Sequence, residues 1–426
     1  MNLKHLATAA VTVVVLALTP RQSAMAHNDT GNAAVVIEWN QLLQDTIGTT
    51  PPFLTTRTFA MMHIAMFDAV NSIEPSYSRY RVRVRAPHGA STDAAAAQAA
   101  HDILAALFPA SLAAYDAALA QRLATIDPGP ARQGIRIGKE VARRVLAWRQ
   151  NDGWETPPPP YVLPPLPGLW QPTPPAFAAA GFTQFPDVEP FALLTSTQYL
   201  PARPPTLTSE EYAAAFNEVK QIGSATSATR TAEQTRLATL FAGVGYATTA
   251  FAIWNNIARD VSRERHYSLI ETARLFAQLN VSMNDGVQTS HTSKFIYGLW
   301  RPVTAIQRAD EDLNEVTAAD PTWASLLTTP PYPSHSGNMA CVGASAARAL
   351  ALNFGTNDIP VTARWVGALG NADVSLRYPG FWQVAEAEAL SRVYGGIHFT
   401  FESVASQESC PKVADYVFEN YMTPRK

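Results

Sequence analysis

The sequence predicts an all-α protein built from two helical bundles, with few or no strands. Alanine-rich segments with apolar residues at every third or fourth position dominate the chain, and strand-like alternation is scarce. The 426 residues are 47% hydrophobic and only 16% charged, which supplies a large core and excludes a disordered chain. A net charge of −3 also excludes a strongly basic nucleic-acid-binding protein.

The first 26 residues have the features of a secretory signal peptide. Lys4 is followed by an apolar run from Leu6 to Leu18 and by the small-x-small sequence Ala24-Met25-Ala26. That run is too short for a helix across about 30 Å of hydrocarbon, and no later segment reaches the ~18 apolar residues that a membrane helix needs. We therefore expect cleavage near Ala26, which leaves a secreted or periplasmic protein without an integral membrane span.

The N-terminal bundle, residues 27–205, is expected to combine helices with a long proline-rich connection. The spacing of apolar residues predicts helices at 57–73, 94–108, 111–123 and 134–149. Proline is too dense between Pro157 and Pro175 for a helix, and loop-like sequence continues to about Pro205. This stretch is expected to join the two bundles.

The C-terminal bundle, residues 206–426, is expected to begin with a capping box. In Thr208-Ser209-Glu210-Glu211, the Thr208 hydroxyl and the Glu211 carboxylate can satisfy free backbone N–H groups and start a helix that runs to about Gln221. Helical periodicity predicts further helices at 231–243, 247–263, 267–291, 339–353, 361–370 and 383–394.

The chain has two cysteines, Cys341 and Cys410. Two are too few for a disulfide scaffold or a cysteine-based zinc site. In an oxidising compartment they can form one disulfide, but the sequence does not supply the Cα separation on which bridging depends.

Three C-terminal segments place positive charges beside aromatic or glycine-rich sequence. They are Lys294-Phe-Ile-Tyr-Gly-Leu-Trp-Arg301-Pro302, Tyr332-Pro-Ser-His-Ser-Gly-Asn338 and Ser391-Arg392-Val-Tyr-Gly-Gly-Ile-His398. A buried charge is costly unless it is paired, and among these cations only Arg392 has an acid, Glu388, at helical spacing. A tetrahedral oxyanion could balance the three charges, with bidentate hydrogen bonds from the arginines. A serine hydroxyl and the Gly337 N–H could add neutral donors, and His398 could bond to the central atom.

Taken together and in this order, the segments resemble the signature of the vanadium-dependent haloperoxidases and the type 2 phosphatidic acid phosphatases. That signature is KxxxxxxRP, then PSGH, then SRxxxxxH followed shortly by an acid. The resemblance is strong over about 281–402, and residues 61–71 also look like the N-terminal bundle of bacterial haloperoxidase-like proteins. Of the two groups, the haloperoxidases are the more similar, because the chain lacks membrane spans and has a two-bundle layout.

The resemblance implies a role for each motif residue. Lys294, Arg301 and Arg392 would bind the equatorial oxygens of vanadate, as would the motif serine and the Gly337 amide. His398 would be the axial ligand, and Glu402 would hold the other imidazole nitrogen. Phosphate could occupy the same site.

The middle motif departs from the family pattern. Without a gap, Ser336 matches the ligand serine and Asn338 stands where the family has its acid/base histidine. With a gap, Ser334 would be the ligand. We favour the register without an insertion. Either Asn338 replaces the histidine or His335 serves instead, and because asparagine cannot transfer protons at neutral pH, cofactor binding is a firmer inference than turnover.

The function that the resemblance implies is an exported haloperoxidase. It would oxidise halide with hydrogen peroxide at bound vanadate, and the product would halogenate a small organic substrate. One alternative is a soluble acid phosphatase that forms a phosphohistidine at His398. Another is an oxyanion-binding homologue that lost its acid/base. His291 stands where some haloperoxidases carry a tryptophan near the halide, and neither halide preference nor oligomeric state follows from the sequence.

Overall fold

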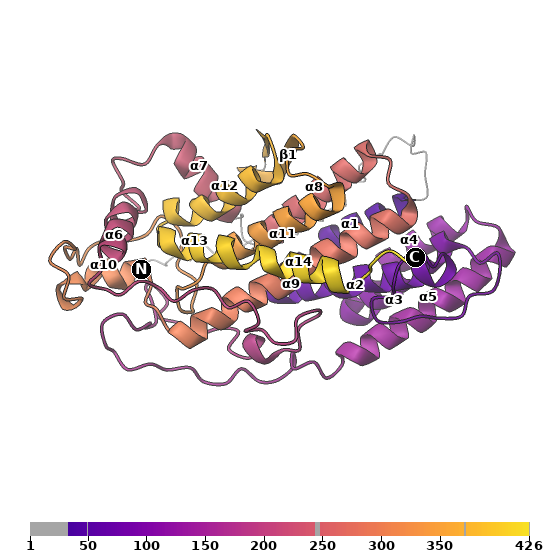
Figure 1. Ribbon diagram of the computed structural model, residues 1–426, viewed down its shortest axis with the longest axis horizontal. Helices are drawn as coiled ribbons and strands as arrows, with labels where there is room; N and C mark the ends of the chain where they lie inside the picture. The colour runs from indigo at the N-terminus through magenta and orange to yellow at the C-terminus, as the bar shows by residue number, and fades with distance from the viewer. Residues whose placement is uncertain (1–32, 49, 243–247, 370–371, 426) are drawn as a thin grey trace, which may run out of the picture. The chain divides into compact units, whose positions relative to one another are not determined.

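The computed structural model describes residues 33–48, 50–242, 248–369 and 372–425 (Figure 1). The expected signal peptide, residues 1–26, lies outside the described residues. Helices make up most of the described chain, as the sequence predicts, and β1 and β2 are its strands. No described helix combines the length and the apolar character that crossing a membrane would take.

The first part of the chain contains four helices close to the predicted ones and one that was not predicted. The helices are α1 (Ala34–Ile47), α2 (Pro52–Ile73), α3 (Thr92–Leu107), α4 (Leu112–Leu123) and α5 (Pro128–Arg149). Helix α3 packs against both α2 and α5. The α3–α5 approach depends on glycine, because a Cβ at Gly138 would lie 2.5 Å from the Ala95 carbonyl oxygen.

The proline-rich connection forms no α-helix, as predicted, and contains only a short 3-10 turn at Phe185–Asp187. A buried carboxylate on α9 fixes part of it. Asp285 accepts hydrogen bonds from the backbone N–H groups of Phe191, Ala192 and Leu193 at 2.7–3.0 Å. The connection therefore runs along α9, the helix that carries Lys294.

The second part of the chain supplies the remaining elements. Its helices are α6 (Glu210–Ile222), α7 (Ala232–Ala242), α8 (Thr248–Glu264), α9 (Leu269–Tyr297), α10 (Pro302–Gln307), α11 (Asn338–Phe354), α12 (Phe381–Tyr394), α13 (Thr400–Ser409) and α14 (Pro411–Asn420). Helix α9 packs against α2 from the first part and against α11 and α14 from the second (Figure 1). One hydrophobic cluster contains residues from both parts, and the expected division near residue 205 stays a prediction.

The prediction of a helix at 361–370 is wrong. Residues Val361–Leu369 form strand β1, which pairs antiparallel with β2 (Ala372–Tyr378). The described side chains follow a period of two rather than 3.6, since Ala363 and Trp365 are buried and Arg364 between them is exposed. Branched and aromatic residues favour a strand at such positions.

The start of α6 also differs from the prediction. Ser209, not Thr208, is the N-cap residue, and its hydroxyl accepts a hydrogen bond from the Tyr212 N–H at 3.1 Å. The helix begins one residue later than the predicted capping box requires. Glu211 therefore lies in the first turn, where a negative charge is favourable, without completing a box.

The two cysteines form a disulfide. Cys341 on α11 is bonded to Cys410, between α13 and α14, with a Cα–Cα distance of 5.3 Å. Both side chains are fully buried. The bond ties α11 to the C-terminal helices that follow His398.

Candidate functional site

The predicted site residues lie at the ends of helices. Lys294 is in the last turn of α9, and Arg301 is the residue just before α10. The two are separated by a turn at Gly298, whose φ of 62° suits glycine. Arg392 lies in the last turn of α12, and His398 lies between α12 and α13.

The three cations are buried with the imidazole. Lys294 and Arg301 have no exposed surface, and His398 and Arg392 are 4% and 7% exposed. In the described part of the chain, no carboxylate lies within ion-pair distance of Lys294, Arg301 or Arg392. A buried cation without a counter-charge is unfavourable, so the site has an excess of positive charge that a ligand could neutralise.

Lys294 and Arg301 are held mainly by backbone carbonyls. The Lys294 ammonium donates to the Ser334 carbonyl oxygen at 2.6 Å and to that of Ser336. Arg301 donates from Nε to the Tyr332 carbonyl and from Nη1 to the Ile397 carbonyl, both at 2.8 Å. Burial is the main reason that the pKa of Lys294 lies well below its usual value, and the neighbouring charge of Arg301 lowers it further.

Each arginine retains an unused donor. Arg301 Nη2 and Arg392 Nε are buried and have no hydrogen-bond partner. Arg392 makes one longer bond, from Nη2 to the Ala238 carbonyl at 3.3 Å. Buried charged donors are rarely left unpaired, so these two N–H groups are candidate contacts for an oxyanion.

His398 is hydrogen-bonded to Glu402, four residues later in the chain. Its Nδ1 is hydrogen-bonded to Glu402 Oε2, which leaves Nε2 on the side of Arg301, 3.3 Å from Nη1. Burial lowers the pKa of His398 well below its usual value, and the charges of Lys294, Arg301 and Arg392, together with the nearby His335, lower it further. The structure therefore brings all four of these groups close to one imidazole.

The two candidate serines have different surroundings. Ser336 Oγ contacts the hydroxyls of Ser293 and Ser290 on α9, at 3.1 and 3.2 Å. Ser334 Oγ is buried and has no partner in regular hydrogen-bond geometry, although it is near enough to Glu402 to lower the pKa of that carboxyl. Of the two hydroxyls, that of Ser334 is therefore the one not bonded to α9, and its neighbour is the Glu402 carboxylate.

His335 and Asn338 also have different hydrogen-bond partners. His335 Nε2 is 2.7 Å from the Ala202 carbonyl, which can only accept, so Nε2 carries the proton and the unpartnered Nδ1 is a proton acceptor. Burial lowers the pKa of His335 to about 4. Asn338 faces α9, where its Oδ1 accepts from the Ser290 hydroxyl at 2.9 Å and its Nδ2 lies 3.3 Å from His291 Nδ1.

The Gly337 amide is less available than expected. Its N–H donates to the Glu402 carbonyl oxygen at 3.3 Å. This bond joins the start of α11 to α13 and so helps to position Glu402. The contact that was expected between this amide and an oxyanion stays a prediction.

Three residues make contacts at the site that the sequence does not predict. The Tyr332 ring lies 5.1 Å from the Arg301 guanidinium carbon and 5.5 Å from the Lys294 ammonium. Ser290 and Ser293 bind the Ser336 hydroxyl from α9. Ser290 lies one turn before Lys294 and Ser293 directly precedes it, and two serines three residues apart share one face of a helix, so this spacing is a signal that could have identified the pair.

Glu388 is not the ion-pair partner of Arg392 that helical spacing suggested. Its Oε2 accepts from the Trp254 indole N–H at 2.8 Å, and its Oε1 has no partner. Burial raises the pKa of Glu388 to about 8, which favours a neutral acid near neutral pH. Arg392 therefore keeps most of its charge for another partner.

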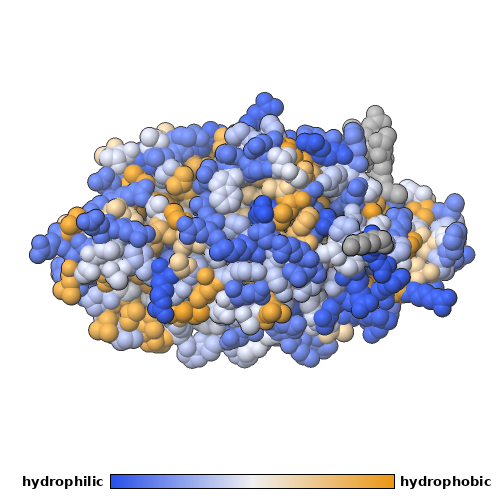
Figure 2. Space-filling view, viewed as in Figure 1, coloured by the Kyte–Doolittle hydropathy of each residue, from blue (hydrophilic) through white to orange (hydrophobic). Residues whose placement is uncertain are grey.

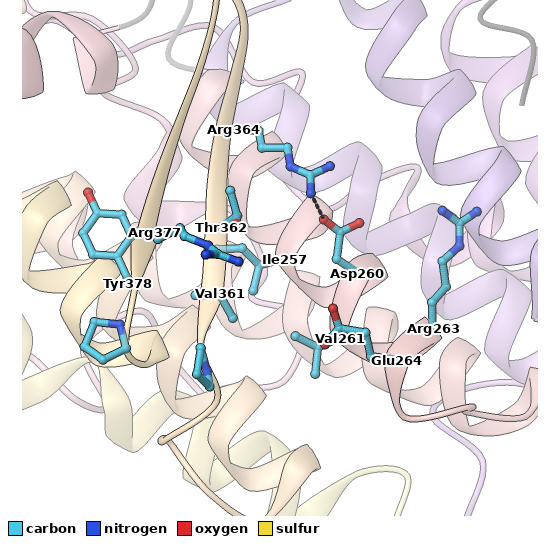
Figure 3. Close-up of a pocket in the computed structure, with 12 residues that line it drawn as sticks. Ile257, Asp260, Val261, Arg263, Glu264, Val361, Thr362, Arg364, Arg377 and Tyr378 are labelled. Atoms are coloured by element: carbon cyan, nitrogen blue, oxygen red, sulfur yellow. Dashed lines mark ion pairs between the residues drawn. The ribbon is translucent and has the colours of Figure 1, made fainter.

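A surface pocket of about 760 Å³ lies elsewhere, between α8 and the β1–β2 hairpin (Figure 3). None of the site residues lines it. Its charged side chains carry both signs, and Arg364 forms an ion pair with Asp260 at 3.5 Å. This pocket therefore lacks the excess of positive charge that the site around His398 has.

Comparisons with known proteins identify the fold that carries these residues. Residues 274–426 match the model of the VCPO second helical-bundle domain. A bacterial vanadium-dependent iodoperoxidase superimposes with a TM-score of 0.79 at 20% identity, over 94% of this chain and 100% of that one. The fold is vanadium haloperoxidase-like.

Two further structures resemble the chain. A holo-type bacterial vanadium-dependent chloroperoxidase gives a TM-score of 0.70 at 16% identity, over 87% of this chain and 92% of that one. An apo-type bacterial vanadium-dependent chloroperoxidase gives 0.68 at 15% identity, over 87% and 94%. A search of curated protein sequences finds no match. At these identities the likeness establishes the fold, and the chemistry depends on this chain's own residues.

Proposed function

We propose that the protein is an exported, vanadium-dependent haloperoxidase-like enzyme that oxidises halide with hydrogen peroxide. One observation carries the proposal. Unpaired donors of Arg301 and Arg392 and the free Ser334 hydroxyl are buried in the same site as the Nε2 of His398. Such a set suits a small tetrahedral oxyanion, because it offers positive charge, hydrogen-bond donors and one nitrogen ligand.

The donor set fits vanadate better than a metal cation. The described residues contain no group of three or more His, Cys, Asp or Glu side chains that could hold a cation. Instead, two guanidinium groups and one ammonium surround the imidazole, and they would repel a cation. Bound vanadate would supply a Lewis acid that activates peroxide for attack by halide.

The chain's own residues would bind and orient the oxyanion. Lys294, Arg301 and Arg392 would offset its negative charge in a buried site, where electrostatic interactions are stronger than in water. Glu402 would keep the proton of His398 on Nδ1, so that Nε2 has a lone pair. That lone pair faces Arg301 Nη1 at 3.3 Å, and the oxyanion would take its place as the partner of Nε2. The unpartnered hydroxyl supports Ser334 as the serine ligand, in contrast to the register that favoured Ser336.

His335 is the better candidate for proton transfer. Its bond to Ala202 fixes the tautomer with a bare Nδ1, and its lowered pKa keeps the ring neutral at pH 7. It is near enough to His398 to affect the pKa of that ring. A neutral imidazole beside the oxyanion can accept a proton from peroxide, a role that Asn338 cannot fill.

Export is supported by the Cys341–Cys410 disulfide. Disulfides persist in oxidising compartments and are rare in the cytosol. Together with the N-terminal sequence, the bond favours a periplasmic or secreted protein. The expected cleavage near Ala26 can be checked by N-terminal sequencing of the exported protein.

The test compares two activities of the purified protein. With orthovanadate, peroxide and bromide, we expect bromination of monochlorodimedone that disappears when vanadate is omitted. Without vanadate, we expect little hydrolysis of p-nitrophenyl phosphate. Phosphatase activity that vanadate inhibits would instead establish the acid phosphatase, for which the same site is suited. Vanadate binding with neither activity would indicate an oxyanion-binding homologue.

A further inference from the structure

A strip of exposed arginines lies far along the chain from the site residues. The four arginines alternate with apolar residues over 79–85, in a segment that follows α2 and forms neither helix nor named strand. Tyr80 and Val82 point inward and are buried, and the arginines are exposed. We call this set the arginine strip: Arg79, Arg81, Arg83 and Arg85.

Helix α2 holds the backbone of the strip in place. Buried Asp68 accepts hydrogen bonds from the N–H groups of Tyr80, Arg81 and Val82 at 2.7–2.9 Å. One turn later, the Ser72 hydroxyl accepts from the Val84 N–H at 3.0 Å. The three bonds to Asp68 bend the chain at Tyr80 and Arg81. Beyond the bend, the N–H groups of Val82 and Val84 both point to α2, so Arg83 and Arg85 project together on the opposite side.

The charges of the strip are not neutralised by neighbouring acids. No member forms an ion pair with a carboxylate in the part of the chain that the structure describes, and the oxygens of nearby Asp68 are taken by backbone N–H groups. Arg79, Arg83 and Arg85, together with His88, line a surface depression of about 760 Å³. In a protein with a net charge of −3, such a cluster is a local excess of positive charge.

The C-terminal end of the chain extends the basic surface. Tyr77 forms a bridge with Pro424, and exposed Arg425 donates its backbone N–H to the Ser76 carbonyl at 3.0 Å. Figure 2 shows strongly hydrophilic residues gathered beside this end of the chain. The basic surface is therefore built from two segments that are distant in sequence.

We propose that the arginine strip binds a linear acidic polysaccharide. Arg83 and Arg85 are two residues apart beyond the bend and are spaced by roughly 6.6 Å along the backbone. Arg79 lines the same depression, so three guanidinium groups are available to a row of anionic groups. Each guanidinium can bind a carboxylate in bidentate fashion. A chain of uronic acids has such carboxylates at regular intervals along a polymer with many hydroxyl groups.

Two other polyanions suit the strip less well. Proteins bind single-stranded nucleic acids with exposed aromatic rings on which bases stack. Tyr80 is buried, and the half-buried Trp148 ring beside the strip is covered by the Arg81 guanidinium at 4.8 Å. A lipid surface is normally bound with apolar side chains that insert between the lipids. None of the exposed large hydrophobic residues lies between 72 and 89.

The test measures binding of the full-length protein to polygalacturonate at low ionic strength. We expect saturable binding that weakens as salt is raised, consistent with release of about three counterions. The triple variant Arg79→Gln, Arg83→Gln, Arg85→Gln should raise the half-saturating polymer concentration at least about tenfold. The fully methyl-esterified polymer, which lacks the charges, should not bind.

A matched triple variant removes the same charge from other elements. Arg132→Gln, Arg377→Gln and Lys412→Gln change exposed residues of α5, β2 and α14 and should leave binding within about twofold. Thermal unfolding of both variants checks the fold. Equal losses in the two variants, or no salt-sensitive binding by the unmodified protein, would overturn the proposal. Tighter, strip-dependent binding of oligothymidylate or of phosphatidylglycerol vesicles would also overturn it.

Discussion

Arg301 is fully buried, yet its Nη2 has no hydrogen-bond partner. Leaving a buried donor unpaired costs about 1–3 kcal/mol, and more when the donor is charged. Arg392 Nε and Ser334 Oγ are in the same condition. An oxyanion that satisfies several such groups at once would gain affinity from each, which is the physical basis for the proposed site.

The two serines offer a direct comparison. Ser334→Ala should weaken vanadate binding by about tenfold or more, because it removes a hydrogen bond to a charged ligand. Ser336→Ala should leave affinity nearly unchanged and instead lower the free energy of unfolding by about 1 kcal/mol, since Ser336 bonds to hydroxyls on α9. Titration calorimetry and urea unfolding measure the two effects. The reverse pattern would restore Ser336 as the ligand.

His335 and Asn338 can be separated by activity. His335→Gln should lower kcat for bromination by about 10²–10⁴ and remove the acid limb of its pH profile, while vanadate still binds. Asn338→Ala should have a smaller effect on kcat and leave the shape of the profile intact, because Asn338 contacts Ser290 and His291. An unchanged profile in His335→Gln would exclude His335 as the proton acceptor.

At the residue scale, the sequence predicts the cations better than their neighbours. Lys294, Arg301, Arg392 and His398 belong to spaced motifs, and the structure brings them together. The choice between Ser334 and Ser336 depends on which hydroxyl meets α9, a contact more than forty residues away along the chain. Local sequence contains no information on such a contact.

At the scale of elements, long helices with strong apolar periodicity can be predicted from the sequence, whereas the short helices and the β-hairpin cannot. The sequence predicts α3 within two residues at both ends and α9 within two residues at its start, but it does not predict α10, which has only Pro302–Gln307. The β1 segment contains alanines and a leucine that suit a helix, but Ala363 and Trp365 pack inward through strand pairing with β2. Tertiary packing overrides local propensity there.

The disulfide is the clearest test at this scale. It closes a 69-residue separation and joins α11, which starts at Asn338, to the end of α13, which carries Glu402. Replacing Cys341 and Cys410 together by alanine should lower the free energy of unfolding by about 2–4 kcal/mol. Urea unfolding measures the change. A reductant should destabilise the unmodified protein and have no effect on the double variant; equal stability of all forms would contradict the account.

At the scale of the whole molecule, buried histidines should make stability depend on pH. Burial lowers the pKa of His63 to about 3, and its Nε2 lies 2.9 Å from Asn40 Nδ2. Below about pH 6.5 the unfolded chain gains a proton at this residue that the folded chain does not accept until about pH 3. The stability that His63 contributes in its neutral form is therefore lost as the pH falls through that window.

A substitution isolates this effect. His63→Gln should reduce the slope of unfolding free energy against pH, between pH 4 and 6, by about 1.4 kcal/mol per pH unit. His101→Gln is the matched control. A hydrogen bond to Asp102 raises the pKa of His101, so both folded and unfolded forms are protonated in that window and the slope should not change. Equal slopes for His63→Gln and the unmodified protein would contradict the prediction.

The fold as a whole was accessible from composition, periodicity and motif order, because helices dominate and the signature segments span much of the second part. How α2 and the proline-rich connection pack against α9 was not accessible, since it depends on buried groups such as Asp285. The proline-rich connection also reaches the site, as the contact of His335 with the Ala202 carbonyl indicates.

Calorimetric titration of the metal-free protein with monomeric orthovanadate tests the central claim most directly. We expect one vanadate per chain for the unmodified protein, and an affinity at least about tenfold lower for Arg301→Gln. Arg308→Gln, which changes a partly exposed arginine paired with Glu311, should bind like the unmodified protein. Absence of vanadate binding, or equal binding by the Arg301 and Arg308 variants, would contradict an oxyanion site around His398.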